Sequence, residues 1–155
     1  MSKKRSFSVT FSHGKAVIAF DVGRKYIGVA STDSSGSIAF PRDTLVWDGT
    51  DQHLTSLLGP LFQEHQFAKC LVGVNASDKR LTQSGGMSVD ASRVTHVLEQ
   101  IQKAPVILVD EHVNTIEAEN RMAETVSSGL ELKKMRKDAL AAQIILERYL
   151  ASENS

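Results

Sequence analysis

The sequence predicts an α/β fold in which helices flank a five-stranded mixed sheet. Three short apolar runs joined by tight turns come first, and two further apolar runs each follow a segment with helical spacing. Two more helical segments close the chain. The resulting order, βββαβαβαα, is typical of a mixed sheet with helices packed on its faces.

The first three strands form an antiparallel meander. Residues 15–20 (KAVIAF) and 26–32 (YIGVAST) have strand composition, and the short DVGRK turn joins them. DSSG at 33–36 is a second turn signal, after which residues 37–47 predict a third strand. Pro41 has no N–H to donate, so this strand belongs at an edge of the sheet.

The rest of the chain alternates helices with buried strands. Apolar residues at helical spacing predict a helix over 51–65, which Gly59-Pro60 should kink or interrupt. Continuous apolar runs predict strands at 68–74 and 105–111 that are buried. Further helices are predicted at 87–101, 115–127 and 137–150.

Length and charge limit the chain to one ordinary globular domain. A 155-residue chain buries about 68–70% of its unfolded surface, which is enough for a real core. We assign that domain to residues 15–151 and interpret the basic, serine-rich residues 1–14 as a flexible extension, with a short organelle-targeting segment as the alternative. Eighteen charges of each sign cancel, which excludes a uniformly basic nucleic-acid binder and leaves only local basic patches.

Cysteine usage and hydropathy indicate the compartment. Cys70 is the single cysteine, so an intrachain disulfide and a cysteine zinc site are excluded, and a reducing compartment is favoured. Its place in AKCLVGV is typical of a small buried strand residue. No apolar run approaches the ~20 residues that span a bilayer, and the first residues lack the apolar stretch of a secretory signal. We therefore expect a cytoplasmic protein with no membrane partner.

Acidic residues lie at the ends of two predicted strands. Asp21 ends VIAFD, and Asp110 and Glu111 end VILVDE. In open α/β sheets, ligands collect at the rim formed by strand ends. A single acid of this kind can simply mark the boundary with solvent, but two strand ends with acids favour a ligand site.

Asp138 is the third acid of interest. Counting by three and four from it gives a stripe that we expect to face the sheet, consisting of Ala141, Ala142, Ile145 and Tyr149. The small alanines would let the helix approach closely and bring Asp138 towards Asp21 and Asp110. A helix N-cap or first-turn acid is the structural alternative. Three converging carboxylates need cations between them, and hard oxygen ligands indicate Mg²⁺ or Mn²⁺.

Basic and glycine residues accompany these acids. Arg24 and Lys25 follow Asp21 in a turn, and the KKMRK run directly precedes Asp138. Both groups are candidate phosphate contacts, although each could also be a solvated surface. The candidates in the run are Lys133, Lys134, Arg136 and Lys137. Gly23 would allow the backbone to turn, and Gly28 would allow a neighbouring element to approach closely.

Four motifs in a fixed order resemble one known family. DVGRKYIGVA, LVGV, VILVDEHVNTIEAE and KDALAAQIILERYL are similar to the YqgF/RuvX family, from about Lys15 to Leu150. That family comprises compact ribonuclease H-like proteins, regarded as Holliday junction resolvases or as nucleases that mature the 5′ end of pre-16S rRNA. The resemblance implies a three-layer ribonuclease H-like fold with a five-stranded mixed sheet. It also implies an RNA precursor or branched DNA as partner, possible contact with pre-ribosomal particles, and a monomer or homodimer.

The activity that the resemblance implies is metal-assisted phosphodiester hydrolysis. The implied catalytic residues are Asp21, Asp110, Glu111 and Asp138. Asp21 would bridge two Mg²⁺ or Mn²⁺ ions about 3.5–4 Å apart, and Asp138 with Asp110 or Glu111 would complete the ligands. One ion would activate water while the other stabilises the leaving oxygen.

Two departures from the family pattern leave other functions open. His112 stands where the family has an arginine, so an imidazole replaces a bidentate phosphate fork, and the loop at 75–86 is longer. A non-catalytic nucleic-acid-binding module is therefore an alternative to a nuclease, and branched DNA is an alternative substrate. Sugar-kinase and actin-like ATPases also read Asp-x-Gly, but they need two such domains, and 155 residues supply one.

Overall fold

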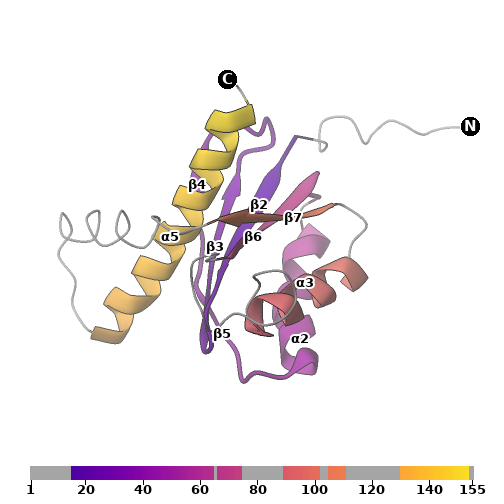
Figure 1. Ribbon diagram of the computed structural model, residues 1–155, viewed down its shortest axis with the longest axis vertical. Helices are drawn as coiled ribbons and strands as arrows, with labels where there is room; N and C mark the ends of the chain where they lie inside the picture. The colour runs from indigo at the N-terminus through magenta and orange to yellow at the C-terminus, as the bar shows by residue number, and fades with distance from the viewer. Residues whose placement is uncertain (1–14, 65, 75–88, 102–104, 111–129, 154–155) are drawn as a thin grey trace, which may run out of the picture.

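The computed structural model describes residues 15–64, 66–74, 89–101, 105–110 and 130–153. One face of a mixed sheet packs against α5 (Leu130–Glu153), and the other packs against α2 (Asp51–Glu64) and α3 (Val89–Ile101), as Figure 1 shows. This three-layer arrangement confirms the predicted fold class. None of these described helices is both long and apolar enough to cross a membrane.

The sheet has β2 at its centre. Its strands are β2 (Val17–Val22), β3 (Tyr26–Thr32), β4 (Ala39–Pro41), β5 (Leu45–Val46), β6 (Lys69–Val74) and β7 (Val106–Asp110). Their order is β4-β3-β2-β6-β7, with β5 also paired to β3. The pairs that involve β3 are antiparallel, whereas β2, β6 and β7 are parallel. The strand that carries Asp21 is therefore supported on both sides.

The single third strand predicted over 37–47 is corrected to two short strands, β4 and β5. Between the pairs Ala30↔Pro41 and Ile27↔Leu45, β3 advances three residues while the opposing segment advances four. One extra residue interrupts the ladder there, as in a β-bulge. The described sheet consequently has six strands rather than five.

We expected Gly59-Pro60 to kink or interrupt the first helix, and the interruption is excluded because α2 continues to Glu64 with Pro60 inside it. Gly59 has no Cβ to clash with the ring of the following proline. The carbonyl that Pro60 cannot bond belongs to Ser56, and both residues are exposed, so water can satisfy it. Glycine and solvent exposure together make this proline tolerable.

The last helix begins earlier than predicted. It starts at Leu130 rather than at 137, so Asp138 lies well past the first turn and is neither an N-cap nor a first-turn acid. Residues 130–136 (LELKKMR) are good helix formers that lack an apolar stripe, which is why the spacing gave no signal. The structural alternative for Asp138 is thereby excluded.

The other predicted elements agree within the described residues. β3 matches its predicted range, and β2 extends two residues further than expected, so that Asp21 lies inside the strand. Helix 87–101 and strand 105–111 are found as α3 and β7. The extension at 1–14, the loop at 75–86 and the helix at 115–127 lie outside the described residues.

Two apolar layers hold the sheet. Beneath α2 and α3 lies the larger cluster, which includes Phe20 and the buried Cys70, as predicted for that cysteine. Under α5, Ala142 and Ile145 pack with Ala19 of β2. Ala141 was expected in the same stripe but belongs to a separate small cluster.

Candidate active site

Asp21 has a glycine beside it on each neighbouring strand. Its register partners are Gly28 of β3 and Gly73 of β6. Val17 and Ala19 pack against α5, so alternation along the strand places Asp21 on that same face of the sheet. The strand is fully buried until Phe20, and Asp21 is half-buried. The carboxylate therefore lies at the edge of the core with no side chain from either adjacent strand crowding it.

Gly28 is the place where α5 approaches this part of the sheet. A Cβ on Gly28 would overlap the carbonyl group of Asp138 and lie 2.9 Å from the amide nitrogen of Ala139. These are backbone atoms of a helix, which cannot rotate away as a side chain can. The close approach predicted for Gly28 is confirmed, and the element that approaches is α5.

Gly28 is next to both Asp21 and Asp138. Gly28 is the cross-strand partner of Asp21, and registered Cα atoms in antiparallel strands lie about 4.5–5.5 Å apart. Asp138 is half-buried and precedes Ala142, which packs on the sheet, by one helical turn. The structure thus brings Asp21 and Asp138 together on the α5 face at the end of β2.

Asp110 is at the same rim, on β7. Asp110 is the last residue of that strand and pairs with Val74 of β6. Asp21 pairs with Gly73 of β6, which in turn pairs with Val109 of β7, so these three residues form one row across the sheet. Asp110 is therefore one residue beyond the row of Asp21. The side chain of Asp110 and the whole of Glu111 lie outside the described residues, as does His112.

The described part of the site supplies two carboxylates. Among the described residues, no three histidine, cysteine, aspartate or glutamate side chains form a group that could hold a metal ion. Asp21 and Asp138 nevertheless fit a divalent cation in type, because carboxylates are hard oxygen ligands, and the close approach of the Asp138 backbone to Gly28 puts the two residues in the same part of the fold. Of the predicted acids, the described side chains are therefore those of Asp21 and Asp138.

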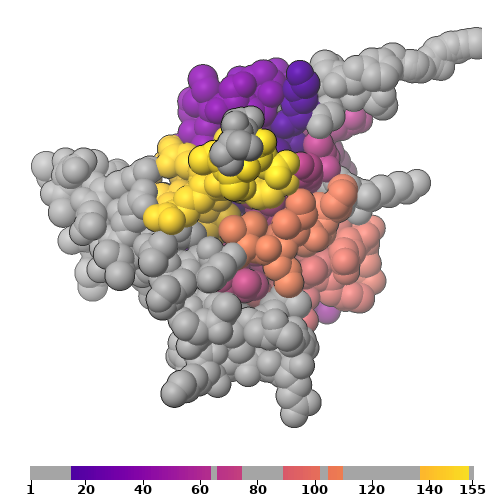
Figure 2. Space-filling view, turned by 45° about the horizontal axis from the view of Figure 1, so that its top comes forward, coloured from indigo at the N-terminus to yellow at the C-terminus, as the bar shows by residue number. Residues whose placement is uncertain are grey.

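The direction of α5 determines where its basic residues lie relative to the end of β2. α5 runs antiparallel to β2. Tyr149 contacts Lys69, which pairs with the first residue of β2 (Oη to Nζ, 2.8 Å), whereas Asp138 lies at Gly28, near the other end of β2. Figure 2 shows the C-terminal part of α5, in yellow, between the violet β3–β4 region and the orange β7. The residues of α5 that precede Asp138 therefore extend past the end of β2.

The candidate cations form two groups, one in the turn after β2 and one in α5. Arg24 and Lys25 are exposed in the turn after β2, and the Lys25 ammonium lies 5.3 Å from the centre of the Tyr26 ring. Lys137 is half-buried next to Asp138. Lys133, Lys134 and Arg136 lie in α5, and their side chains are outside the described residues.

Sequence reasoning missed one residue of this region, Trp47, which was not among its functional candidates. Trp47 is buried and donates its indole N–H to the carbonyl of Gly23 (3.1 Å), in the turn that follows Asp21. The same turn requires Gly23, because a Cβ there would lie 2.9 Å from the carbonyl oxygen of Tyr26. Only the fact that Trp47 is the single tryptophan could have drawn attention to it.

The sheet order and the position of α5 define a ribonuclease H-like fold. Solved structures share this fold at low identity. RuvC of Thermus thermophilus has a TM-score of 0.55 at 10% identity, covering 90% of this chain and 96% of that one. The fowlpox virus Holliday junction resolvase has a TM-score of 0.51 at 12% identity, covering 90% and 99%.

Sequence comparison identifies the family. The RuvX model, described as "Holliday junction resolvase", matches residues 15–152, and the chain belongs to this family. A relative from Oceanobacillus iheyensis, named "Putative pre-16S rRNA nuclease", is 34% identical over 86% of this chain and 96% of its own. A relative of the same name from Thermoanaerobacter pseudethanolicus is 28% identical over 90% and 98%. The predicted resemblance is confirmed.

Proposed function

We propose that this protein is a metal-dependent nuclease that hydrolyses phosphodiester bonds near the 5′ end of pre-16S rRNA. The observation that carries the proposal is the meeting of Asp21 and Asp138 at Gly28 on the α5 face of the sheet. Membership of the RuvX family supports a nuclease, and the names of the curated relatives support the substrate. Such a substrate would place the protein in the cytoplasm, with pre-ribosomal particles as its partner and the protein as a monomer or homodimer.

The acids of the site would hold Mg²⁺ or Mn²⁺. Asp21 and Asp138 are the described ligands, and the Asp110-Glu111 pair would supply the third. A bound ion supplies Lewis-acid stabilisation of charge on the phosphoryl oxygens. The protein contributes the fixed positions of its carboxylates, and its cations bind the flanking phosphates.

Strand alternation favours Glu111 over Asp110 as the third ligand. Val109 shares the row of Asp21, and a strand that continued in the same way would return to that face at 111 rather than at 110. We therefore predict that Glu111→Gln lowers the single-turnover cleavage rate more than Asp110→Asn does. The opposite order would assign the ligand to Asp110.

The cations beside the acids would bind the nucleic-acid backbone. These are Arg24, Lys25, Lys133, Lys134, Arg136 and Lys137. Each phosphate contact releases counterions, so binding through these residues must weaken as salt rises. A local group of cations of this kind would attract nucleic acid even though the net charge of the whole chain is zero.

We predict that K133Q/K134Q weakens oligonucleotide binding in EDTA and lowers the slope of log K against log salt by about 1 for each lost phosphate contact. Fluorescence anisotropy between about 50 and 200 mM salt measures that slope. Arg148→Gln, on an exposed residue near the opposite end of α5, is the matched control and should leave the slope unchanged. Equal slopes in all three proteins would remove these lysines from the interface.

One assay tests the function itself. The purified protein is incubated with a pre-16S rRNA leader and with a branched DNA junction, each in Mg²⁺, in Mn²⁺ and in EDTA. Cleavage of the leader in metal but not in EDTA is the expected result. Cleavage of the junction alone would favour the second candidate, a resolvase, which the description of the family model supports. Binding without cleavage in any condition would indicate the non-catalytic module.

A further inference from the structure

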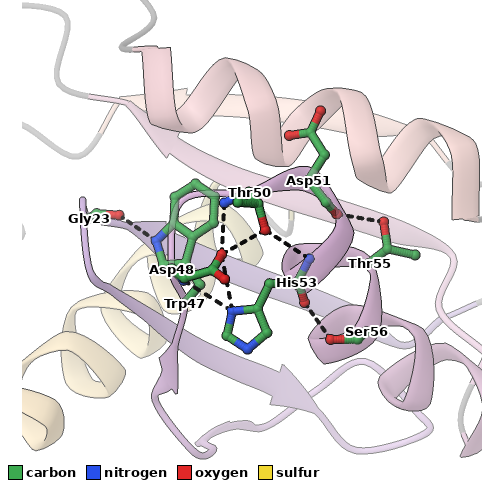
Figure 3. Close-up of polar contacts among 8 residues, drawn as sticks. All are labelled: Gly23, Trp47, Asp48, Thr50, Asp51, His53, Thr55 and Ser56. Atoms are coloured by element: carbon green, nitrogen blue, oxygen red, sulfur yellow. Dashed lines mark hydrogen bonds and ion pairs between the residues drawn. The ribbon is translucent and has the colours of Figure 1, made fainter.

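Trp47 donates two hydrogen bonds to the turn between β2 and β3. The indole N–H of Trp47 donates to the carbonyl of Gly23 (3.1 Å), as Figure 3 shows. The backbone N–H of Trp47 donates to the carbonyl of Lys25 (3.0 Å). Within the turn itself, the Gly23 N–H donates to the Tyr26 carbonyl (2.8 Å). Trp47 therefore holds the carbonyls on both sides of Arg24.

Trp47 is itself anchored in the body of the protein. Its side chain is only 3% exposed and belongs to the core beneath α2 and α3. The Arg93 guanidinium lies 5.9 Å from the centre of the indole ring, and Arg93 Nε donates to Asp51 Oδ1 (3.1 Å), which ties α3 to the first turn of α2. Trp47 thus contacts the turn from the face of the sheet opposite α5.

The segment that follows Trp47 is also fixed. Thr50 caps α2, because its hydroxyl accepts the N–H of His53 (3.2 Å), and Asp48 accepts both the amide and the hydroxyl of Thr50 (2.9 and 2.7 Å; Figure 3). The hydrogen bonds from Thr50 hold the pKa of Asp48 below its ordinary value. The stability that these bonds contribute is fully present above the ordinary pKa of an aspartate and is lost as the pH falls through the lowered pKa, so it is present at neutral pH.

We infer that Trp47 is a positioning residue that fixes the turn at 23–25 so that Arg24 and Lys25 bind the substrate backbone beside Asp21. Both cations are exposed, and a short turn with charged side chains loses conformational entropy when it binds a phosphate. A turn already held by two hydrogen bonds has much of that entropy removed before binding. The inference rests on the proposed function in assigning the turn to nucleic-acid binding.

The sharpest test removes only the hydrogen bond. Because Trp47 is the single tryptophan, it can be replaced biosynthetically by 3-benzothienylalanine, which has the shape of tryptophan and sulfur in place of the N–H. Loss of one hydrogen bond predicts a rise of about two- to tenfold in Kd for an RNA oligonucleotide in EDTA, with KM rising similarly and kcat little changed. Trp47→Phe should show the same split, and Val97→Ala in the same core cluster is the control for packing loss.

A second readout separates this inference from the proposed function. Tryptophan emission of the unmodified protein should change on saturation with the oligonucleotide in EDTA, and R24Q/K25Q should abolish that change. If no metal supports cleavage, the nuclease proposal fails, but the binding and emission measurements still decide the role of Trp47. Unchanged Kd in the isostere together with unchanged emission on binding would overturn the inference.

Discussion

Asp21→Asn should reduce cleavage by more than about 100-fold while the protein remains folded. Partners one step removed from a metal typically cost 10–100-fold when lost, so a direct ligand should exceed that range. The amide keeps the size of the side chain, which lies at the edge of the core between Gly28 and Gly73. Single-turnover cleavage in saturating Mg²⁺ measures the effect, and circular dichroism checks the fold.

Stability in EDTA gives this variant a second signature. Two carboxylates held together without a cation repel each other, so removing the charge of Asp21 should leave the metal-free protein at least as stable as the wild type. Added Mg²⁺ should raise the melting temperature of the wild type but not of the variant. Asp43→Asn, an exposed acid between β4 and β5, is the matched control for both measurements. Full activity in Asp21→Asn would refute the site.

Among substitutions that add one methyl group to the sheet, Gly28→Ala should lower the free energy of unfolding the most. The new Cβ would overlap the carbonyl of Asp138, and relief requires α5 to move as a body. We expect a loss of at least about 3 kcal/mol in the free energy of unfolding, at the upper end of the cost of overpacking. Urea unfolding monitored by circular dichroism measures it.

Catalysis distinguishes this effect from ordinary destabilisation. In Gly28→Ala the backbone of Asp138 is displaced, so cleavage by the folded protein should also fall. Val29→Ala removes buried methyl groups from the opposite face, towards α2 and α3, and should lower stability without lowering the rate of the folded fraction. Equal rates in the two variants would show that Asp138 does not need its position at Gly28.

The sequence was most informative where one physical rule dominates. Alternating turns and apolar runs predicted β2, β3, β6 and β7, because a buried strand must be apolar whatever its neighbours are. The absence of a Cβ at Gly28 predicted close packing, although it could not say which element packs there. Register was beyond reach, since glycine on both sides of Asp21 is a property of three strands together.

The errors also have physical causes. The start of α5 escaped notice because residues 130–136 carry no apolar stripe, and only helix propensity marks them. The division into β4 and β5 depends on one extra residue against β3. Trp47 could not be assigned because its indole N–H bonds a backbone carbonyl, which every residue possesses. Interactions with backbone atoms leave no trace in side-chain patterns.

The central claim is that Asp21 and Asp138, distant in sequence, bind a common divalent ion at the end of β2. The most direct measurement is anomalous diffraction from crystals grown with Mn²⁺. The account predicts an anomalous peak in contact with carboxylate oxygens of both residues. Saturating Mn²⁺ with no peak at that corner, or a peak bound only elsewhere, would contradict it.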